Sequence, residues 1–178
     1  MRSGADSINP ACYGNTLDSE NGTQAAARSY LGSGSRLLKW MSKSNVAIYR
    51  ATDGRVGGHK LGLPLYLLST TGRKGGLSRT TPLIFVADGA RVVLVASQGG
   101  LPTHPMWFLN LCANSEVHVQ IRAETHTMCA RVADDAERTQ LWPRLIAHNP
   151  RWARYQSWTD RLIPVVVCEP GRPSVGRE

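Results

Sequence analysis

The sequence contains no long apolar run and few cysteines. Among its 178 residues, no stretch reaches the roughly 18 consecutive apolar residues that a membrane-spanning helix needs. The first residues also lack the apolar segment of a secretion signal. The four cysteines are Cys12, Cys112, Cys129 and Cys168, and no two of them form a CxxC pair. A disulfide framework is therefore not expected, and a reducing cytoplasm is the predicted location.

The usual catalytic patterns are missing as well. The five histidines are scattered without an HExxH spacing, and no GxSxG segment occurs, so no metal site and no serine nucleophile are expected. The P-loop pattern GxxxxGK[ST] is also absent. An enzyme with such a sequence would take its chemistry from a cofactor that the protein binds and orients.

Acidic residues are scarce in one part of the chain. The formal net charge is +8, and residues 31–79 hold nine basic side chains against a single acid, Asp53. The charges of residues 1–30 and 80–178 nearly balance. Concentrated positive charge attracts an anionic partner such as phosphate, nucleic acid or an acidic membrane surface. A basic face that is simply solvated is the alternative.

The chain is expected to begin and end in mobile tails. Residues 1–34 are rich in small and polar side chains, with too little apolar surface to offset the entropy of ordering, and residues 171–178 form the second tail. Residues 51–170 are predicted to form the folded domain.

Residues 35–50 predict a basic amphipathic helix. Ser35 can cap its start, and four apolar side chains fall near one face, namely Leu37, Leu38, Met41 and Ile48. The helix packs on its own domain or lies peripherally on a membrane surface.

The rest of the chain predicts a mainly β domain. Six apolar or alternating runs are expected to be strands: 63–69, 80–86, 91–97, 116–121, 125–132 and 162–168. Residues 51–62 are expected to be a loop and 87–90 a hairpin turn. Short helices are expected at 105–113, after the capping residue Asp134, and after Asn149-Pro150. Strands joined mostly by hairpins favour an antiparallel barrel with short flanking helices.

Segment 70–79 is the strongest candidate for binding an anion. Its glycines let the backbone turn and expose N–H groups, and Arg73, Lys74 and Arg79 add three cations. An ordinary basic hairpin loop is the alternative. Two further segments offer donors or flat surfaces: the turn 95–100 and the start of the helix in 104–110, where an anion is favoured. Taken alone, Met106, Trp107 and Phe108 are more typical of a core than of a cofactor site.

Together these segments resemble the deazaflavin (coenzyme F420)-dependent nitroreductase family and its F420H2-dependent quinone reductases. The resemblance rests on TTGRKGGLSRTTPL (70–83), VASQGG (95–100), HPMWFLNLCANSEVHVQ (104–120) and RYQSWTDRLIPVVVCEP (154–170). Four motifs in the right order are far more specific than one glycine pattern. The resemblance implies a split β-barrel like that of FMN-binding reductases. It also implies hydride transfer from reduced F420 to a quinone, nitroaromatic or activated enone.

The resemblance implies the following site residues. The phosphate and polyglutamate tail of F420 would contact Arg73, Lys74, Gly75, Arg79, Thr80 and Thr81. The ring would lie along Val95, Ala96, Ser97 and Gln98. The phosphate end would also meet Met106, Trp107, Phe108, Leu109 and Asn110, and Trp152 would cover the ring unless it is a core residue. Ser97 and Tyr155 are the candidates for hydrogen-bonding the acceptor as charge develops on it.

Several positions depart from the family pattern. Gln98 stands where members have lysine, Asn149 and Trp152 stand where nitroreducing members have tyrosine, and Ile84 replaces an aromatic. The acceptor pocket is therefore expected to differ. An FMN-dependent reductase of the same fold and a non-catalytic F420 carrier are the alternatives. Nucleic-acid binding is not expected, because the aromatics are remote in sequence from the basic segment.

Overall fold

The computed structural model describes residues 46–56, 58–60 and 62–171, without the side chain of residue 60. Residues 46–51 are helical. The predicted N-terminal tail, the first part of the predicted helix 35–50, and all but the first residue of the predicted C-terminal tail lie outside the described residues.

The helical residues 46–51 are anchored by Tyr49 rather than by Ile48. Tyr49 is 2% exposed, whereas Ile48 is 42% exposed. The Tyr49 hydroxyl accepts a hydrogen bond from the backbone N–H of Arg122 at 3.1 Å. Gly54 lies over the same ring, where a Cβ atom would approach within 2.8 Å. This helix is therefore fixed to the turn at Arg122 through one buried aromatic side chain.

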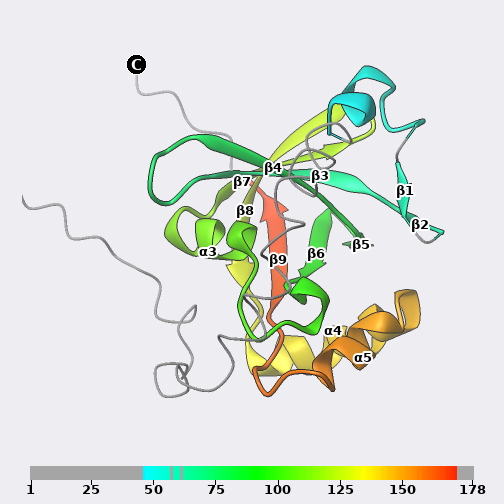
Figure 1. Ribbon diagram of the computed structural model, residues 1–178, viewed down its shortest axis with the longest axis vertical. Coiled ribbons are helices and arrows are strands. Elements are labelled where there is room, and N and C mark those ends of the chain that lie inside the picture. The colour runs from blue at the N-terminus through cyan, green and yellow to red at the C-terminus, as the bar shows by residue number, and fades with distance from the viewer. Residues whose placement is uncertain (1–45, 57, 61, 172–178) are drawn as a thin grey trace, which may run out of the picture.

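The elements that follow are, in chain order, β1 (His59–Lys60), β2 (Leu63–Pro64), β3 (Tyr66–Thr71), β4 (Ser78–Leu83), β5 (Phe85–Asp88), β6 (Arg91–Val95), the 3-10 turn η2 (Gln98–Gly100), α3 (Met106–Ala113), β7 (Glu116–Ile121), β8 (Glu124–Val132), α4 (Asp135–His148), α5 (Arg151–Gln156) and β9 (Val165–Pro170) (Figure 1). β1 and β2 form a small hairpin, which corrects the expectation that residues 51–62 are entirely loop. Its strands are only two residues long, too short to show alternation in the sequence.

Seven strands form one sheet in the order β4-β3-β7-β8-β9-β6-β5, with every neighbouring pair antiparallel. β4 and β5 lie at opposite edges, yet only Ile84 separates them in the chain. The two edges must therefore meet at Ile84, which curls the sheet into a barrel. The rings of Tyr66 on β3 and Phe85 on β5 stack across this seam with centroids 3.8 Å apart.

The predicted strands are present with three changes. The run 63–69 is divided between β2 and β3, because Leu63 and Pro64 pair with β1 whereas the strand that begins at Tyr66 pairs with β4 and β7. The run 80–86 is divided between β4 and β5, because its first part pairs with β3 and its last part with β6. The last strand begins at Val165 rather than at Leu162. Leu162 is 56% exposed, and Pro164, directly before the strand, has no N–H to donate to the ladder. The hairpin at 87–90 is confirmed by the pairing of Asp88 with Arg91. The mainly β architecture with short flanking helices is confirmed.

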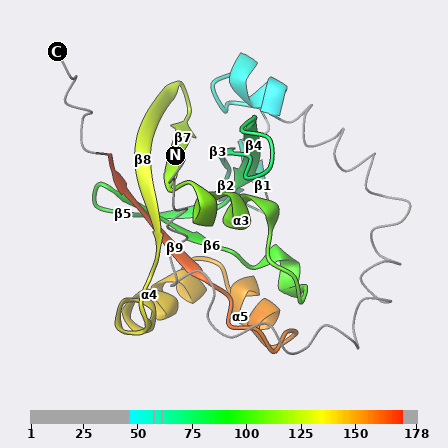
Figure 2. The ribbon, with the colours of Figure 1, turned by 90° about the vertical axis from the view of Figure 1, so that its left-hand side faces the viewer.

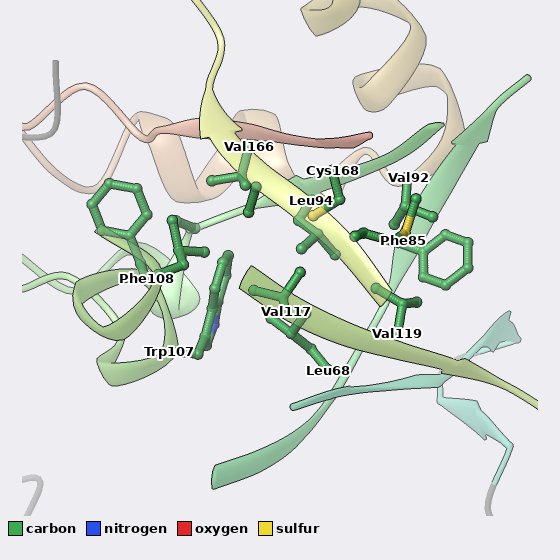
Figure 3. Close-up of a cluster of buried hydrophobic side chains, with 14 residues drawn as sticks. Leu68, Phe85, Val92, Leu94, Trp107, Phe108, Val117, Val119, Val166 and Cys168 are labelled. Carbon is green, nitrogen blue, oxygen red and sulfur yellow. The ribbon is translucent and has the colours of Figure 1, made fainter. Parts of the chain in front are cut away.

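Two hydrophobic clusters lie on the two faces of the sheet. The first surrounds α3, and the ten of its residues that are labelled in Figure 3 are Leu68, Phe85, Val92, Leu94, Trp107, Phe108, Val117, Val119, Val166 and Cys168. The second packs beneath α4 and α5 and comprises Val93, Val95, Ala133, Leu141, Leu145, Trp152, Ile163, Val165 and Val167. β6 and β9 contribute to both clusters, which explains why their sequences are continuously apolar. In β7, by contrast, polar and apolar residues alternate along most of the strand, because only one of its faces is buried.

The helices α4 and α5 lie together at the end of the molecule opposite residues 46–51 (Figures 1 and 2). The predicted cap at the start of α4 is confirmed, since the carboxylate of Asp134 accepts from the N–H of Glu137 at 2.8 Å. Pro143 lies in the interior of α4. α5 follows Asn149-Pro150 as expected. No helix within the described residues is long and apolar enough to cross a bilayer.

Candidate functional site

The basic loop between β3 and β4 is a closed turn with its cations outside. The N–H of Gly72 donates to the carbonyl of Leu77 at 2.9 Å, and the N–H of Gly76 donates to the carbonyl of Gly72 at 2.8 Å. Gly76 has φ +66°, a conformation that glycine adopts without strain. Arg73, Lys74 and Gly75 are exposed. Among the described residues, no hydrogen bond or ion pair holds the side chains of Arg73 and Lys74, so both cations are available to an anion.

Asn110 connects this loop to α3. It is 5% exposed, and its amide oxygen accepts from the backbone N–H of Arg73 at 3.2 Å. Its amide nitrogen donates to the hydroxyl of Thr70 at 3.1 Å. Thr70 is itself 2% exposed, so both bonds are protected from water. The segments 70–76 and 104–110, distant in sequence, are thereby brought together.

β4 extends this basic surface. Arg79 is exposed, and Thr80 and Thr81 are half-buried. The Thr80 hydroxyl lies 2.8 Å from that of Ser69 and accepts from the guanidinium of Arg50 at 3.3 Å. Because side chains alternate along a strand, Arg79 and Thr81 lie on one face of β4 and Thr80 on the other. The three residues therefore do not present one common surface.

The side chains of α3 divide between solvent and core. Met106 is 59% exposed, whereas Trp107 and Phe108 are 6% and 1% exposed. Both rings lie in the first cluster (Figure 3), which fits the core alternative for their side chains. Leu109 is half-buried against the same cluster. A bound molecule at this helix would meet Met106 and the backbone rather than the two aromatic rings.

The chain leaves β6 through a tight turn with an unusual backbone. The side chains of Val95 and Ala96 belong to the second and first clusters. Gln98, Gly99 and Gly100 then have φ of 49°, 67° and 80°. A non-glycine residue in this left-handed region is uncommon and concentrates at functional sites. At Gly100 a Cβ atom would lie 3.0 Å from the carbonyl oxygen of Tyr155, so the turn packs directly on α5.

Arg161 is the site residue that the sequence reasoning missed. It is 8% exposed and donates to the carbonyls of Ala96 at 3.1 Å, Ser97 at 2.8 Å and Leu101 at 2.9 Å. Burial lowers the pKa of its guanidinium. The available signal was an arginine next to the continuously apolar run 162–168, a setting in which a charge needs a specific partner.

His104 lies beside this buried cation. Its Nδ1 is 3.4 Å from the guanidinium of Arg161, and its ring lies 4.9 Å from that of Phe108. A guanidinium can only donate, so Nδ1 is the acceptor and the proton of the neutral ring is on Nε2. Burial lowers the pKa of His104, and the charge of Arg161 lowers it further.

The aromatic residues near α5 differ in exposure. Trp152 is 4% exposed in the second cluster, so the described chain gives it a core environment, and its contact with a cofactor stays a prediction. Asn149 is likewise buried at 5%. Trp158 is 60% exposed and lies next to the half-buried Tyr155, with ring centroids 5.5 Å apart. Trp158 is therefore the tryptophan that faces solvent beside the 98–100 turn.

α3 links the two parts of the candidate site. Just before its N-terminus, His104 contacts Arg161 behind the 96–101 segment, and in its middle Asn110 holds the basic loop. The helical part between these contacts, from Met106 to Asn110, rises about 6 Å at 1.5 Å per residue. A long ligand with an anionic end could thus contact the basic loop and the turn at Ser97 together.

A cavity of about 520 Å³ lies elsewhere in the barrel. It is lined mainly by apolar residues of β5, β6 and β8, including Phe85, Val92 and Met128. Because it adjoins the β5–β6 turn, it lies at the opposite end of β6 from Ser97. Within the described residues, no cluster of His, Cys, Asp and Glu could hold a metal ion.

The F420H(2)-dependent quinone reductase family matches residues 40–170. An F420H(2)-dependent quinone reductase of Mycobacterium tuberculosis (strain ATCC 25618 / H37Rv) is 41% identical over 125 residues, which cover 68% of this chain and 84% of that protein.

Two solved structures are also similar. One, described as a domain-swapped dimer, has a TM-score of 0.58 and 37% identity, covering 74% of this chain and 98% of its own. The other, an F420-H2 dependent reductase, has a TM-score of 0.56 and 40% identity, covering 60% of this chain and 94% of its own.

The environment of His104 predicts a pH effect on stability. Its folded-state pKa is below the ordinary 6.5, so the unfolded chain binds this proton more tightly. The contribution of His104 is therefore fully present above about pH 6.5 and is lost as the pH falls from there through the lower folded-state pKa. Urea unfolding at about pH 8 and about pH 5.5 should show a larger loss of stability in the wild type than in His104→Gln. Equal losses would contradict the assigned environment.

Proposed function

Because the chain belongs to the F420H(2)-dependent quinone reductase family, we propose that it is an F420H2-dependent oxidoreductase that reduces a small organic acceptor. Bound F420H2 supplies the hydride. The observation that carries the proposal is the basic loop, in which Arg73 and Lys74 have no side-chain partner among the described residues and which Asn110 holds beside α3 through the Arg73 N–H. Neither FMN-dependent chemistry nor a carrier role without turnover is favoured by this family membership.

The residues of the basic loop fit the anionic end of F420. Arg73 and Lys74 offer charged donors, and Gly75 lets a phosphate approach the backbone closely. Arg79 and Thr81 extend the surface along β4, while the hydroxyl of Thr80 is engaged within the protein. We assign the phosphate and polyglutamate tail to this loop. Asn110 is uncharged, and its part is to hold the Arg73 N–H and thereby the loop.

The turn after β6 fits the ring end of the cofactor. Ser97 is 9% exposed, and among the described residues its hydroxyl forms no hydrogen bond. Gln98 lacks the charge of a lysine, and its amide donates to the Thr103 hydroxyl at 3.3 Å. We assign the ring to Val95–Gln98 and the adjoining surface of α3, with Met106 as the exposed apolar contact.

The acceptor is assigned to the surface beside this turn, where the turn packs on α5. Ser97 and Tyr155 are the groups that would donate hydrogen bonds to an acceptor oxygen as negative charge develops on it. A quinone is the acceptor that we favour, since the family is named for quinone reduction. Nitro compounds are less favoured, because Asn149 and Trp152 are buried where the nitroreducing members carry tyrosines.

We further propose that the protein is cytoplasmic and touches the membrane surface through the basic segment 35–50. The support is the charge of this segment in the sequence and the exposure of Ile48 at its end. Sedimentation with anionic vesicles, compared with zwitterionic vesicles, should recover the full chain in the anionic pellet. Equal recovery from both would remove this part of the proposal.

The proposed activity is tested with the full chain and reduced F420. A panel of a menaquinone analogue, a nitroimidazole and an activated enone should show oxidation of F420H2 that is fastest with the menaquinone analogue. The readout is the return of oxidised F420 absorbance, with heat-denatured protein as control. Oxidation no faster than in buffer with any acceptor would refute the proposal, as would purified protein that retains FMN and does not bind F420.

The role of the basic loop is tested by measuring the affinity of loop variants for F420. Arg73→Ala and Lys74→Ala should each weaken F420 binding by about 1–2 kcal/mol, the value of one charge-assisted hydrogen bond. Arg122→Gln is the matched control, because β3–β7 pairing places residue 122 at the other end of β3 from the loop. Fluorescence titration measures the dissociation constants. If both loop variants bind as the control does, the anionic tail lies elsewhere.

A further inference from the structure

The guanidinium of Arg161 is a buried cation without an acidic partner in the described part of the chain. Its donors are directed at three backbone carbonyls, those of Ala96, Ser97 and Leu101, at 2.8–3.1 Å. Burying a charge is costly, and an apolar side chain of similar size often stabilises a fold as well or better. The free-energy cost of burying this charge suggests that Arg161 has a role beyond packing.

The contacts of Arg161 determine where the neighbouring N–H groups point. In a planar trans peptide the C=O and the following N–H point in opposite directions. The carbonyls of Ala96 and Ser97 point toward the guanidinium. The N–H groups of Ser97 and Gln98 therefore point away from it.

These two N–H groups have no acceptor among the described residues. The neighbouring N–H groups do have acceptors. The N–H of Ala96 donates to the carbonyl of Pro164 at 2.9 Å, and the N–H of Gly100 donates to the carbonyl of Ser97 at 3.0 Å. The Ser97 hydroxyl, on the same residue, is also unpaired within that part of the chain. The turn thus presents two backbone donors and one hydroxyl side by side.

We propose that Arg161 is a positioning residue that turns the Ser97 and Gln98 N–H groups outward as a donor pair for an electron-rich oxygen or nitrogen atom of the F420 ring. This inference rests on the proposed function and adds a residue outside the binding surface itself. The buried cation also places positive potential behind the two peptide groups, which favours a ring atom carrying negative charge.

The test compares Arg161→Met, Arg161→Lys and the matched control Arg138→Met. Arg138 is a half-buried arginine on α4 whose guanidinium lies 4.5 Å from the Trp142 ring and donates to Gln156 at 3.4 Å. Among the described residues it has no hydrogen bond to the 96–101 segment. Arg161→Met should weaken F420 binding about tenfold, Arg161→Lys should weaken it less, and Arg138→Met should bind as the wild type does.

A second readout does not depend on turnover. In the wild type, F420 should shift the backbone amide signals of Ser97 and Gln98 and slow their hydrogen exchange. In Arg161→Met those changes should be lost while the melting temperature shows a folded protein. If Arg161→Met does not fold, Arg161→Lys carries the same comparison.

The outcomes separate the two proposals. A wild type that fails to bind F420 overturns the proposed function together with this inference. A wild type that binds, with Arg161→Met binding equally well or with unmoved Ser97 and Gln98 amides, overturns the role of Arg161 alone.

Discussion

The constraint on which this fold depends is the single residue that joins the two edges of its sheet. β4 and β5 end a seven-stranded order at opposite sides, and Ile84 alone connects them. The sheet cannot stay open, so it must curl until the edges meet. Stacking of Tyr66 on Phe85 closes the seam, and the apolar side chains of the concave face gather around α3.

This closure positions both parts of the candidate site. α3 is buried through Trp107 and Phe108 in the first cluster, so the direction of Asn110 and the location of His104 follow from core packing. Asn110 then holds the loop after β3, and His104 lies against Arg161. The binding surface is thus fixed by buried contacts, although the cations that it presents are exposed.

β6 and β9 separate the two hydrophobic clusters. Each has one face in each cluster, so these paired strands separate the interior around α3 from the layer beneath α4 and α5. The 96–101 segment follows β6 directly and therefore begins at the boundary between the two clusters. Arg161 precedes β9 and reaches the segment from the neighbouring strand end, which explains how one side chain contacts carbonyls some 60 residues away.

The sequence was sufficient for features that depend on local patterns. Alternation identified β7, the segment able to pair with it identified β8, Asp-Gly identified the β5–β6 hairpin, and Asp134 identified the start of α4. Family motifs identified the basic loop and its partner helix.

Features that depend on distant partners could not be read in this way. The division of residues 80–86 at Ile84 depends on which strands each half pairs with. The burial of Trp152 depends on a cluster to which four elements contribute, β6, α4, α5 and β9. Arg161 was missed because its acceptors are backbone carbonyls, which leave no signature in a sequence.

The separation of the two clusters has a consequence for how such proteins diversify. The loop assigned to the anionic end of the cofactor rests on the cluster around α3, whereas Tyr155 and Trp158 belong to the layer beneath α4 and α5 or border it. Substitutions on α5 can accumulate without disturbing the packing that supports the basic loop. A duplicated copy of such a chain can therefore change its acceptor while the loop for the anionic end of the cofactor and the barrel are inherited unchanged.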